Sequence, residues 1–308
     1  MLVLCFAILS LHKFLKKMAK IGLSERLYLQ YLRTKFKTLA LVSPAIAGQK
    51  AFELFCTPYP KYKKKKAPAI FHQATPLTVS LPDGIQLRGY EWTSQKSHNK
   101  TVLIVHGYAS HGYKFEQYVA PLLKRGFRVL IFDAPGHGLS QGKYINIILY
   151  LNAIEQIIKA VGPVDHFIGH SLGGIALAML AETIPNPEHH KFVLIAPATK
   201  TTTSFNNYFD LMRFSEVIKA SFITYAATLT TYPITHFEAD RAIEKYTGPI
   251  LWVHDAEDKV CPYKDLINFQ EKAPKNINFL ITKGLGHNKV YKTQAVIDKI
   301  MAFLAPED

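Results

Sequence analysis

The stretch Phe167-Ile168-Gly169-His170-Ser171-Leu172-Gly173-Gly174 decides the fold that the sequence predicts. Ser171 stands between Gly169 and Gly173 in the spacing G-x-S-x-G, which is typical of a sharp strand-to-helix turn that exposes a serine hydroxyl. Small side chains, mostly Ala and Leu, continue from Ile175 to Glu182 and predict a helix after the turn. The same spacing also occurs in loops, but the flanking strand and helix patterns favour the turn.

Outward from this turn, the rest of the chain alternates between buried strands and helices. Predicted strands occupy 77–81, 85–92, 102–105, 129–132, 164–168, 192–195, 250–253 and 277–281, and predicted helices occupy 113–125, 145–161, 172–183, 263–272 and 290–304. The first two strands form a hairpin, and the later alternation predicts an α/β domain over 76–308 with a mainly parallel sheet and helices on both faces. Ligands of such sheets bind at the carboxyl ends of the strands.

An insertion over about 198–247 interrupts the alternation. It has a helical pattern and is rich in aromatic and apolar side chains, including Phe205, Phe209 and Phe222. Its position in the chain predicts a helical cap that overhangs the turn at Ser171. The aromatic side chains either form an apolar roof for an acyl group or, for most of them, the core of the cap itself.

The net charge of +14 is concentrated in the N-terminal arm, predicted over 1–75. Residues 1–70 hold 14 Lys and Arg side chains against two acids, and so carry +12 of that charge. A basic segment indicates an anionic partner. Because the arm begins with the apolar run Leu2–Leu11, a phospholipid surface fits better than a nucleic acid, and we expect no nucleic-acid partner.

The arm is too short in its apolar part to cross a membrane, since a spanning helix needs about 20 residues. Positive charge follows the run Leu2–Leu11 and does not precede it, which argues against a secretory signal. Residues 11–42 then place apolar positions at helical spacing among basic ones, which fits either a helix in a membrane interface or an arm packed on the protein's own surface. A second helix is predicted over 45–56, and Lys63–Lys66 predict an exposed linker.

The three cysteines, Cys5, Cys56 and Cys261, lie far apart and show neither a disulfide framework nor metal-ligand spacing. We also find no dinucleotide-binding fingerprint, so no cofactor and no metal are expected. These features predict a cytoplasmic protein, with the arm peripheral on the inner face of the membrane.

Chemistry-bearing residues follow several of the predicted strands. After Ser171 come the acids Asp255, Glu257 and Asp258, and then His287. A serine nucleophile needs a base to take its proton and a carboxylate to orient that base. The chain order of serine, acid and histidine is the order found in α/β-hydrolases.

The chain resembles serine hydrolases of the α/β-hydrolase superfamily, close to the branch of monoacylglycerol-lipase-like enzymes and esterases. Four motifs within 77–305 carry the resemblance: His106-Gly107, the loop 133–140, Gly169–Gly173, and His254–Pro262 together with Gly286-His287. The resemblance implies an α/β-hydrolase fold with a helical cap insertion.

The resemblance also implies the roles of single residues. Ser171 is the nucleophile, His287 the base and Asp258 the acid, since His254, Asp258 and Pro262 match the family's spacing. Asp255 is a weaker rival acid, and His111 and His254 are alternative bases. The backbone N–H groups of Leu172 and Tyr108 are expected to stabilise the oxyanion, while His106, His137 and His170 shape or hold loops.

The sequence therefore predicts hydrolysis of a carboxylic ester, with lipid-derived esters included, through an acyl-enzyme. Two alternatives stay open. The same three residues serve thioesterases and amide or peptide hydrolases, and a non-catalytic binding protein uses the same fold. The expected partners are a small-molecule acyl ester and, through the arm, an anionic membrane surface.

Overall fold

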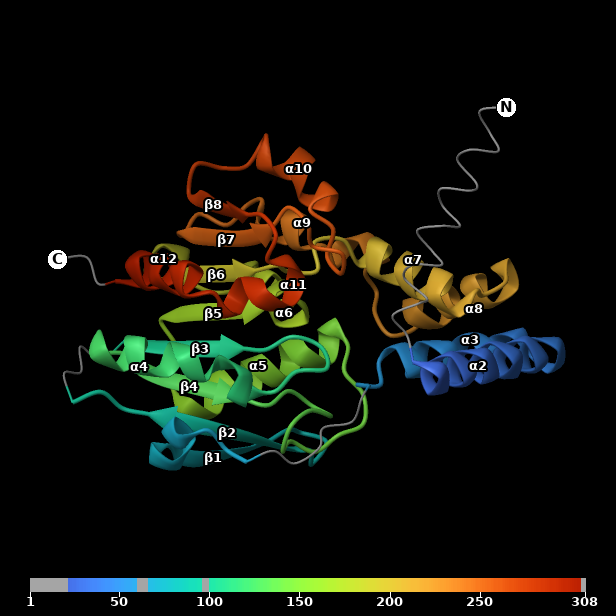
Figure 1. The fold of residues 1–308 in the computed structure, drawn as a ribbon, viewed down its shortest axis with the longest axis horizontal. Helices are drawn as coiled ribbons and strands as arrows, with labels where there is room; N and C mark the ends of the chain where they lie inside the picture. Colours follow the sequence, from blue (N-terminus) through green and yellow to red (C-terminus); the bar gives the residue numbers. More distant parts are fainter. Residues whose placement is uncertain (1–21, 60–65, 96–99, 306–308) are drawn as a thin grey trace. The chain divides into compact units, whose positions relative to one another are not determined.

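A computed structural model of the chain describes residues 22–59, 66–95 and 100–305 (Figure 1). The predictions for Leu2–Leu11, for 11–21 and for most of the linker Lys63–Lys66 lie outside these residues. Across the described ranges, no helix combines the length and apolar character that a membrane span requires. The chain divides into two compact units, one comprising residues up to Leu54 together with Phe205–Thr231, the other comprising Phe55–Ser204 and Tyr232 onward.

The second unit is built on an eight-stranded sheet with the order β1-β2-β4-β3-β5-β6-β7-β8 (Figure 1). β1 and β2 pair as an antiparallel hairpin, β2 runs antiparallel to β4, and all other neighbours are parallel. The strands are β1 (Thr75–Ser80), β2 (Gln86–Trp92), β3 (Thr101–Val105), β4 (Arg128–Phe132), β5 (His166–His170), β6 (Lys191–Ile195), β7 (Ile250–Asp255) and β8 (Ile277–Thr282). The predicted α/β-hydrolase fold with a mainly parallel sheet is confirmed.

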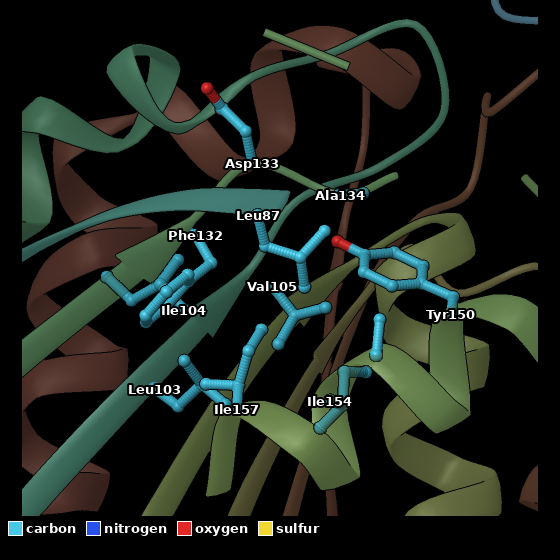
Figure 2. Close-up of a pocket in the computed structure, with 11 residues that line it drawn as sticks. Leu87, Leu103, Ile104, Val105, Phe132, Asp133, Ala134, Tyr150, Ile154 and Ile157 are labelled. Atoms are coloured by element: carbon cyan, nitrogen blue, oxygen red, sulfur yellow. The ribbon is translucent and has the colours of Figure 1, made fainter. Parts of the chain in front are cut away.

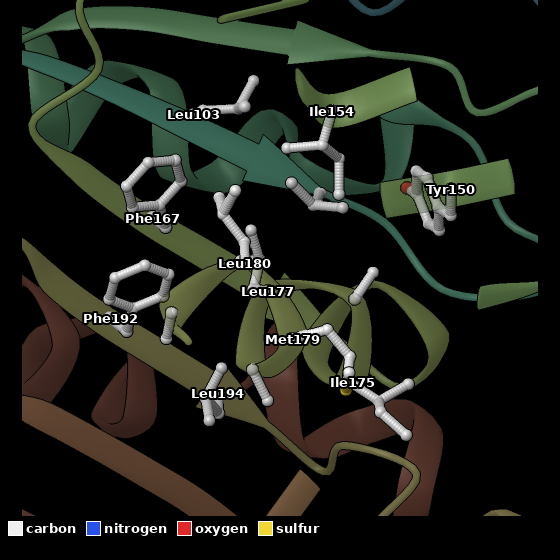
Figure 3. Close-up of a cluster of buried hydrophobic side chains, with 14 of the residues drawn as sticks. Leu103, Tyr150, Ile154, Phe167, Ile175, Leu177, Met179, Leu180, Phe192 and Leu194 are labelled. Carbon is white, nitrogen blue, oxygen red and sulfur yellow. The ribbon is translucent and has the colours of Figure 1, made fainter. Parts of the chain in front are cut away.

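Two hydrophobic clusters cover the two faces of the sheet because successive strand residues point to opposite sides. Leu103 and Val105 of β3 belong to the cluster that contains α5 (Ile147–Val161) and α6 (Leu172–Ala181). Figure 3 shows the side chains of this cluster, with Phe167 and Phe192 from the sheet facing Leu177 and Leu180 of α6. Val102 and Ile104 point to the other cluster, which contains α4 (Glu116–Lys124) and α12 (Gln294–Leu304). Burial on both faces explains why the central strands are continuous apolar runs.

Shorter helices complete the second unit. They are η1 (Ala69–Gln73), η2 (Gly112–Phe115), η3 (Pro187–His189), η4 (Ile234–His236), α9 (Ala239–Ile243), α10 (Lys264–Gln270), α11 (Gly286–Lys289) and η5 (Val290–Lys292). The predicted helix 290–304 is therefore shorter than expected, because Thr293 is extended and separates η5 from α12.

The strand that leads into Ser171 starts later than predicted, at His166 and not at Val164. Pro163 has no N–H to donate to a ladder. The side chain of Asp165 accepts a hydrogen bond from the N–H of Thr101 at 2.7 Å, and the N–H of Asp165 donates to the carbonyl oxygen of Thr101 at 3.0 Å. Strand pairing with β3 runs from His166 to Gly169, and pairing with β6 runs from His166 to His170, directly before the serine.

The first unit combines helices of the N-terminal arm with helices of the insertion. The arm gives α2 (Leu23–Val42) and α3 (Pro44–Phe55), and the insertion gives α8 (Glu216–Ala227) and, from Phe205 onward, α7 (Thr201–Met212). Gly48 allows α3 and α8 to approach closely, since a Cβ at this position would lie 2.3 Å from the carbonyl carbon of Ser221. Aromatic side chains fill the space between the helices. The ring centroids of Phe36 and Phe214 are 5.3 Å apart, and those of Phe52 and Phe222 are 5.2 Å apart.

The compact units divide the chain differently from the predicted domains. The prediction separates an arm over 1–75 from a hydrolase domain over 76–308, whereas the described arm helices belong to one unit with the middle of the insertion. The apolar residues of both segments explain this arrangement. Phe205 and Phe209 each meet Phe222 edge-on. From the arm, Phe52 packs on Phe222 and Phe36 packs on Phe214.

A cavity between the sheet and α5 is lined by Leu103, Val105, Tyr150 and Ile154, among others (Figure 2). Its volume is about 10 Å³, close to the minimum that holds one water molecule. It is a packing defect of the core and is too small for a substrate.

Candidate active site

The turn at Ser171 joins β5 to α6 in a strained conformation. Ser171 has φ 54° and ψ −116°, a combination that costs about 1–3 kcal/mol in a non-glycine residue and occurs mostly at functional sites. The flanking glycines are required by contact. A Cβ on Gly169 would lie 2.7 Å from the carbonyl oxygen of Gly173, and a Cβ on Gly173 would lie 2.4 Å from that of Val105. The packing of this turn explains the G-x-S-x-G spacing.

A chain of hydrogen bonds runs from Ser171 through His287 to Asp258. The Nε2 atom of His287 lies 3.0 Å from Oγ of Ser171, and its Nδ1 atom lies 2.7 Å from Oδ2 of Asp258. A carboxylate oxygen only accepts, so Nδ1 carries the proton and Nε2 is left to accept the serine proton. The structure therefore brings together the three residues predicted as nucleophile, acid and base, from α11 and from the ends of β5 and β7.

The two rival acids have separate roles. The Oδ1 atom of Asp258 accepts the N–H groups of Val260 and Cys261 at 2.8 and 2.9 Å, which leaves Oδ2 directed at His287. Asp255 bonds no histidine among the residues that the structure describes. Its oxygens accept the Thr282 hydroxyl at 2.8 Å and the N–H of Leu285 at 3.0 Å.

Asp255 therefore serves to hold a loop. Burial alone would raise the pKa of its carboxyl group, but the bonds from Thr282 and from the backbone of Gly286, Leu285 and Glu257 lower it. These bonds tie β7 to the segment that carries His287.

Both alternative bases lie outside the hydrogen-bond chain. His254 is fully buried, and its Nε2 atom lies 2.8 Å from the carbonyl oxygen of Cys261, while its Nδ1 accepts from Trp252. His111 is also buried, with its ring edge-on to Tyr113. His287 is thus the histidine that the described residues place at Ser171.

His170 holds the backbone of His287. Its Nε2 atom lies 3.1 Å from the carbonyl oxygen of His287, and its ring centroid lies 4.7 Å from that of His287 and 4.3 Å from that of Tyr291. Burial, and then the charge of His287, hold the pKa of His170 well below its ordinary value. A neutral His170 donates through Nε2 and does not repel a protonated His287.

The loop after β3 passes directly beside the serine. A Cβ on Gly107 would lie 2.9 Å from Cβ of Ser171, so glycine permits this contact. Within the described ranges, neither the N–H of Tyr108 nor that of Leu172 donates a hydrogen bond to a protein acceptor. The Tyr108 hydroxyl donates to the carbonyl oxygens of Phe55 and Thr57, which anchors this residue by its side chain.

Two neutral histidines fix this loop against the loop 133–140. The Nε2 atom of His106 accepts the N–H of Ala134 at 2.9 Å, and the Nε2 atom of His137 accepts the N–H of Ala109 at 3.1 Å. Burial is the main cause that lowers the pKa of each imidazole to about 4. Asp133 accepts the N–H of Gly112 at 2.7 Å and completes the frame.

Sequence reasoning did not place Cys261 in the site. Burial raises the pKa of its thiol well above the ordinary value, and the neighbouring Ser171 side chain lowers it in part. A protonated thiol is a poor nucleophile. Of these two groups, Ser171 is the one for which a hydrogen bond to a histidine is present.

The arrangement can abstract a hydroxyl proton and direct the resulting nucleophile at an acyl group. Within the part of the chain that the structure describes, no group of three or more His, Cys, Asp or Glu side chains is arranged to hold a metal ion.

A family model described as serine aminopeptidase, S33, matches residues 96–233. A serine hydrolase-like protein from Danio rerio is 32% identical over 117 residues, which cover 36% of this chain and 35% of that protein. Alpha/beta hydrolase domain-containing protein 17C from Mus musculus is 23% identical over 214 residues, which cover 67% of this chain and 60% of that protein. The chain thus spans less than two thirds of the length of these curated relatives.

Among solved structures, the esterase Pf2001 from Pyrococcus furiosus matches with a TM-score of 0.59 and 20% sequence identity. The match covers 80% of this chain and 95% of that one. At this identity the likeness shows the fold.

Proposed function

We propose that this chain is a hydrolase of the α/β-hydrolase superfamily and that it cleaves carboxylic esters with Ser171 as nucleophile. One observation carries the proposal, namely the hydrogen-bond chain from Ser171 through His287 to Asp258. A serine hydroxyl at its ordinary pKa is a weak nucleophile, and an adjacent oriented base activates it.

The first half-reaction forms an acyl-enzyme. Oγ of Ser171 attacks the ester carbonyl carbon while Nε2 of His287 takes the hydroxyl proton. Asp258 stabilises the imidazolium through Nδ1. The tetrahedral intermediate then collapses, the bond to the alcohol oxygen breaks, and the leaving alkoxide takes the proton from Nε2.

The second half-reaction reverses the roles with water as the nucleophile. His287 takes a proton from water, the hydroxide attacks the acyl carbon, and Ser171 leaves with the proton that His287 returns. The products are a carboxylic acid and an alcohol, and the enzyme is regenerated.

The oxyanion of each intermediate needs donors beside Ser171. The N–H groups of Leu172, at the N-terminus of α6, and of Tyr108 are the proposed pair, since neither donates elsewhere among the described residues. Preorganised donors of this kind contribute about 10²–10³ in turnover.

Amide hydrolysis is the second candidate, because the matching family model is described as a serine aminopeptidase. The esterase among the solved structures favours esters. Lipid-derived esters belong to the proposed class, but the aromatic side chains expected to line an acyl roof largely pack within the first unit. Acyl-chain length is therefore left to a substrate panel.

The test uses a fluorophosphonate probe and three substrate series. Labelling should occur in the wild type and in Ser80→Ala, an exposed control serine, and should disappear in Ser171→Ala. p-Nitrophenyl esters of increasing acyl length, acyl thioesters and aminoacyl p-nitroanilides then rank the bonds cleaved. We expect the esters to have the highest kcat/KM and Ser171→Ala to lose about 10⁶ in kcat.

Absence of labelling would contradict a catalytic serine and favour a binding protein. Labelling with preference for the anilides would retain the serine mechanism and replace the ester assignment by an amide one.

A further inference from the structure

Helix α2 uses only part of its surface to pack against the first unit. Leu32 and Phe36 are buried, and the Phe36 ring meets Phe214 edge-on. Arg33 adds a hydrogen bond from its guanidinium to the carbonyl oxygen of Leu211 at 2.7 Å. This face accounts for the helix as a structural element of the unit.

The opposite face carries an exposed apolar stripe. The exposed fractions are 74% for Leu23, 60% for Leu27, 59% for Tyr31, 82% for Leu41 and 81% for Val42. With 3.6 residues per turn, the first three follow one another along the helix, and Leu41 returns to the direction of Leu23 after about five turns. The exposed side chains of Thr34 and Thr38 lie on the same face, between Tyr31 and Leu41. Single exposed apolar residues are normal, whereas several on one helix face indicate an interaction surface.

Positive charge borders this stripe. Helical geometry places the exposed side chains of Lys35 and Lys37 on its two sides. The single acid of α2, Glu25, lies on the side of Leu32 and Phe36. Four more lysines lie between Lys13 and Lys20 in the sequence that precedes the helix. A partner of this surface must offer both negative charge for the lysines and an apolar region for the stripe. An anionic lipid surface offers both.

We infer that the stripe of α2, defined by Leu23, Leu27, Tyr31, Leu41 and Val42, docks on an anionic phospholipid bilayer. The apolar side chains enter the boundary between head groups and acyl chains, and the lysine stems reach outward so that the ammonium groups meet lipid phosphates. The helix lies in the plane of the surface. This inference is independent of the reaction at Ser171.

The sequence of this segment fits two alternatives, a membrane interface and packing on the protein's own surface. One face of α2 packs on the protein. The inference assigns the membrane to the other face only.

The test is co-sedimentation of the full chain with phosphatidylcholine vesicles, with and without phosphatidylglycerol. We expect binding to the anionic vesicles that falls at least about tenfold in Leu27→Gln/Tyr31→Gln, because the buried apolar area is lost. The matched control is Val217→Gln/Leu229→Gln, which changes two exposed apolar residues of the same unit outside α2 and should bind like the wild type.

A second variant, Lys35→Gln/Lys37→Gln, changes exposed side chains only and keeps the test informative if the first fails to fold. It should weaken binding to anionic vesicles about tenfold or more and leave binding to neutral vesicles unchanged. A far-UV circular dichroism spectrum and a helix content equal to those of the wild type confirm folding of each variant.

Two results would overturn the inference. One is vesicle binding that is the same in the stripe variant and in the control. The other is a vesicle-free dimer that Leu27→Gln/Tyr31→Gln dissociates, which would show that a second copy covers the stripe.

Discussion

The site around Ser171 and the stripe of α2 differ in which groups meet water. The site buries polar groups, whereas the stripe exposes apolar ones. At the site, the buried carboxylate of Asp258 is satisfied by His287 and two backbone N–H groups. On α2, large apolar side chains such as Leu27 are left in water. A satisfied buried network fixes geometry because breaking any bond leaves a costly unpaired group. Exposed apolar area gives the isolated chain no such stability, and its benefit comes with a partner.

The largest loss of activity is expected from a substitution of Asp258, the acid of the site. We expect Asp258→Asn to lower kcat/KM for an ester about 10⁴-fold, because the amide no longer holds the correct tautomer of His287. Asp255→Asn, the matched control from the same strand end, should lose far less activity, and its main effect should be a lower melting temperature. Steady-state kinetics and thermal unfolding measure both. Greater loss in Asp255→Asn would reverse the assignment of the two acids.

A second pair of variants compares the close approaches in the two units. Ala at Gly173 places a Cβ 2.4 Å from the Val105 carbonyl oxygen, and Ala at Gly48 places one 2.3 Å from the backbone of Ser221. A displacement of about 1 Å at a reacting group costs about 10² in rate, so Gly173→Ala should slow fluorophosphonate labelling by that factor.

Gly48→Ala should instead destabilise the first unit by about 1–3 kcal/mol through overpacking. Its labelling rate should stay close to that of the wild type, because the turn at Ser171 is untouched. Equal slowing in both variants would mean that the reactivity of Ser171 depends on the packing of the first unit.

The strands and the three reactive residues could be predicted from local patterns. A run such as Val102–Val105 is continuous because both of its faces are covered, and that requirement is readable in the sequence. Ser171, Asp258 and His287 follow strand ends in a family order. The choice between Asp258 and Asp255 depended on the resemblance, since both acids follow β7 and only the hydrogen bonds separate their roles.

Long-range packing was outside the reach of these patterns. The rings of Phe36 and Phe214 are in contact although the two residues lie far apart in the sequence. The periodicity of either segment does not indicate that the other is its packing partner. The sequence thus predicted the arm helices and the insertion but not their common unit. Cys261 was missed for a similar reason, because its contact with Ser171 arises from the fold of the loop after β7.

A smaller effect is expected at His170, which acts through another residue. His170→Phe keeps an aromatic ring beside His287 and removes the bond to its carbonyl oxygen. We expect kcat to fall about tenfold with little change in KM, since the base is displaced by less than 1 Å. His170→Asn, which retains a donor, should recover part of the loss. A higher KM with an unchanged kcat would contradict a positioning role.

The mildest test is the pH dependence of stability. The pKa of His106 and of His137 is about 4 in the folded protein and about 6.5 when unfolded. Their stabilising contribution is complete above pH 6.5 and declines as pH falls toward 4, because the unfolded chain binds the protons first. In urea unfolding, His137→Gln should reduce this slope by up to about 1.4 kcal/mol per pH unit. The exposed control His189→Gln should keep the wild-type slope.

The central claim is that turnover passes through an acyl group on Ser171. Rapid acid quenching during turnover of a p-nitrophenyl ester, followed by mass spectrometry of the peptides, tests it directly. We expect a mass increase equal to the acyl group on the peptide that contains Ser171, and no such increase in Ser171→Ala. Turnover with Ser171 unmodified, or with the acyl group on Cys261, would contradict it.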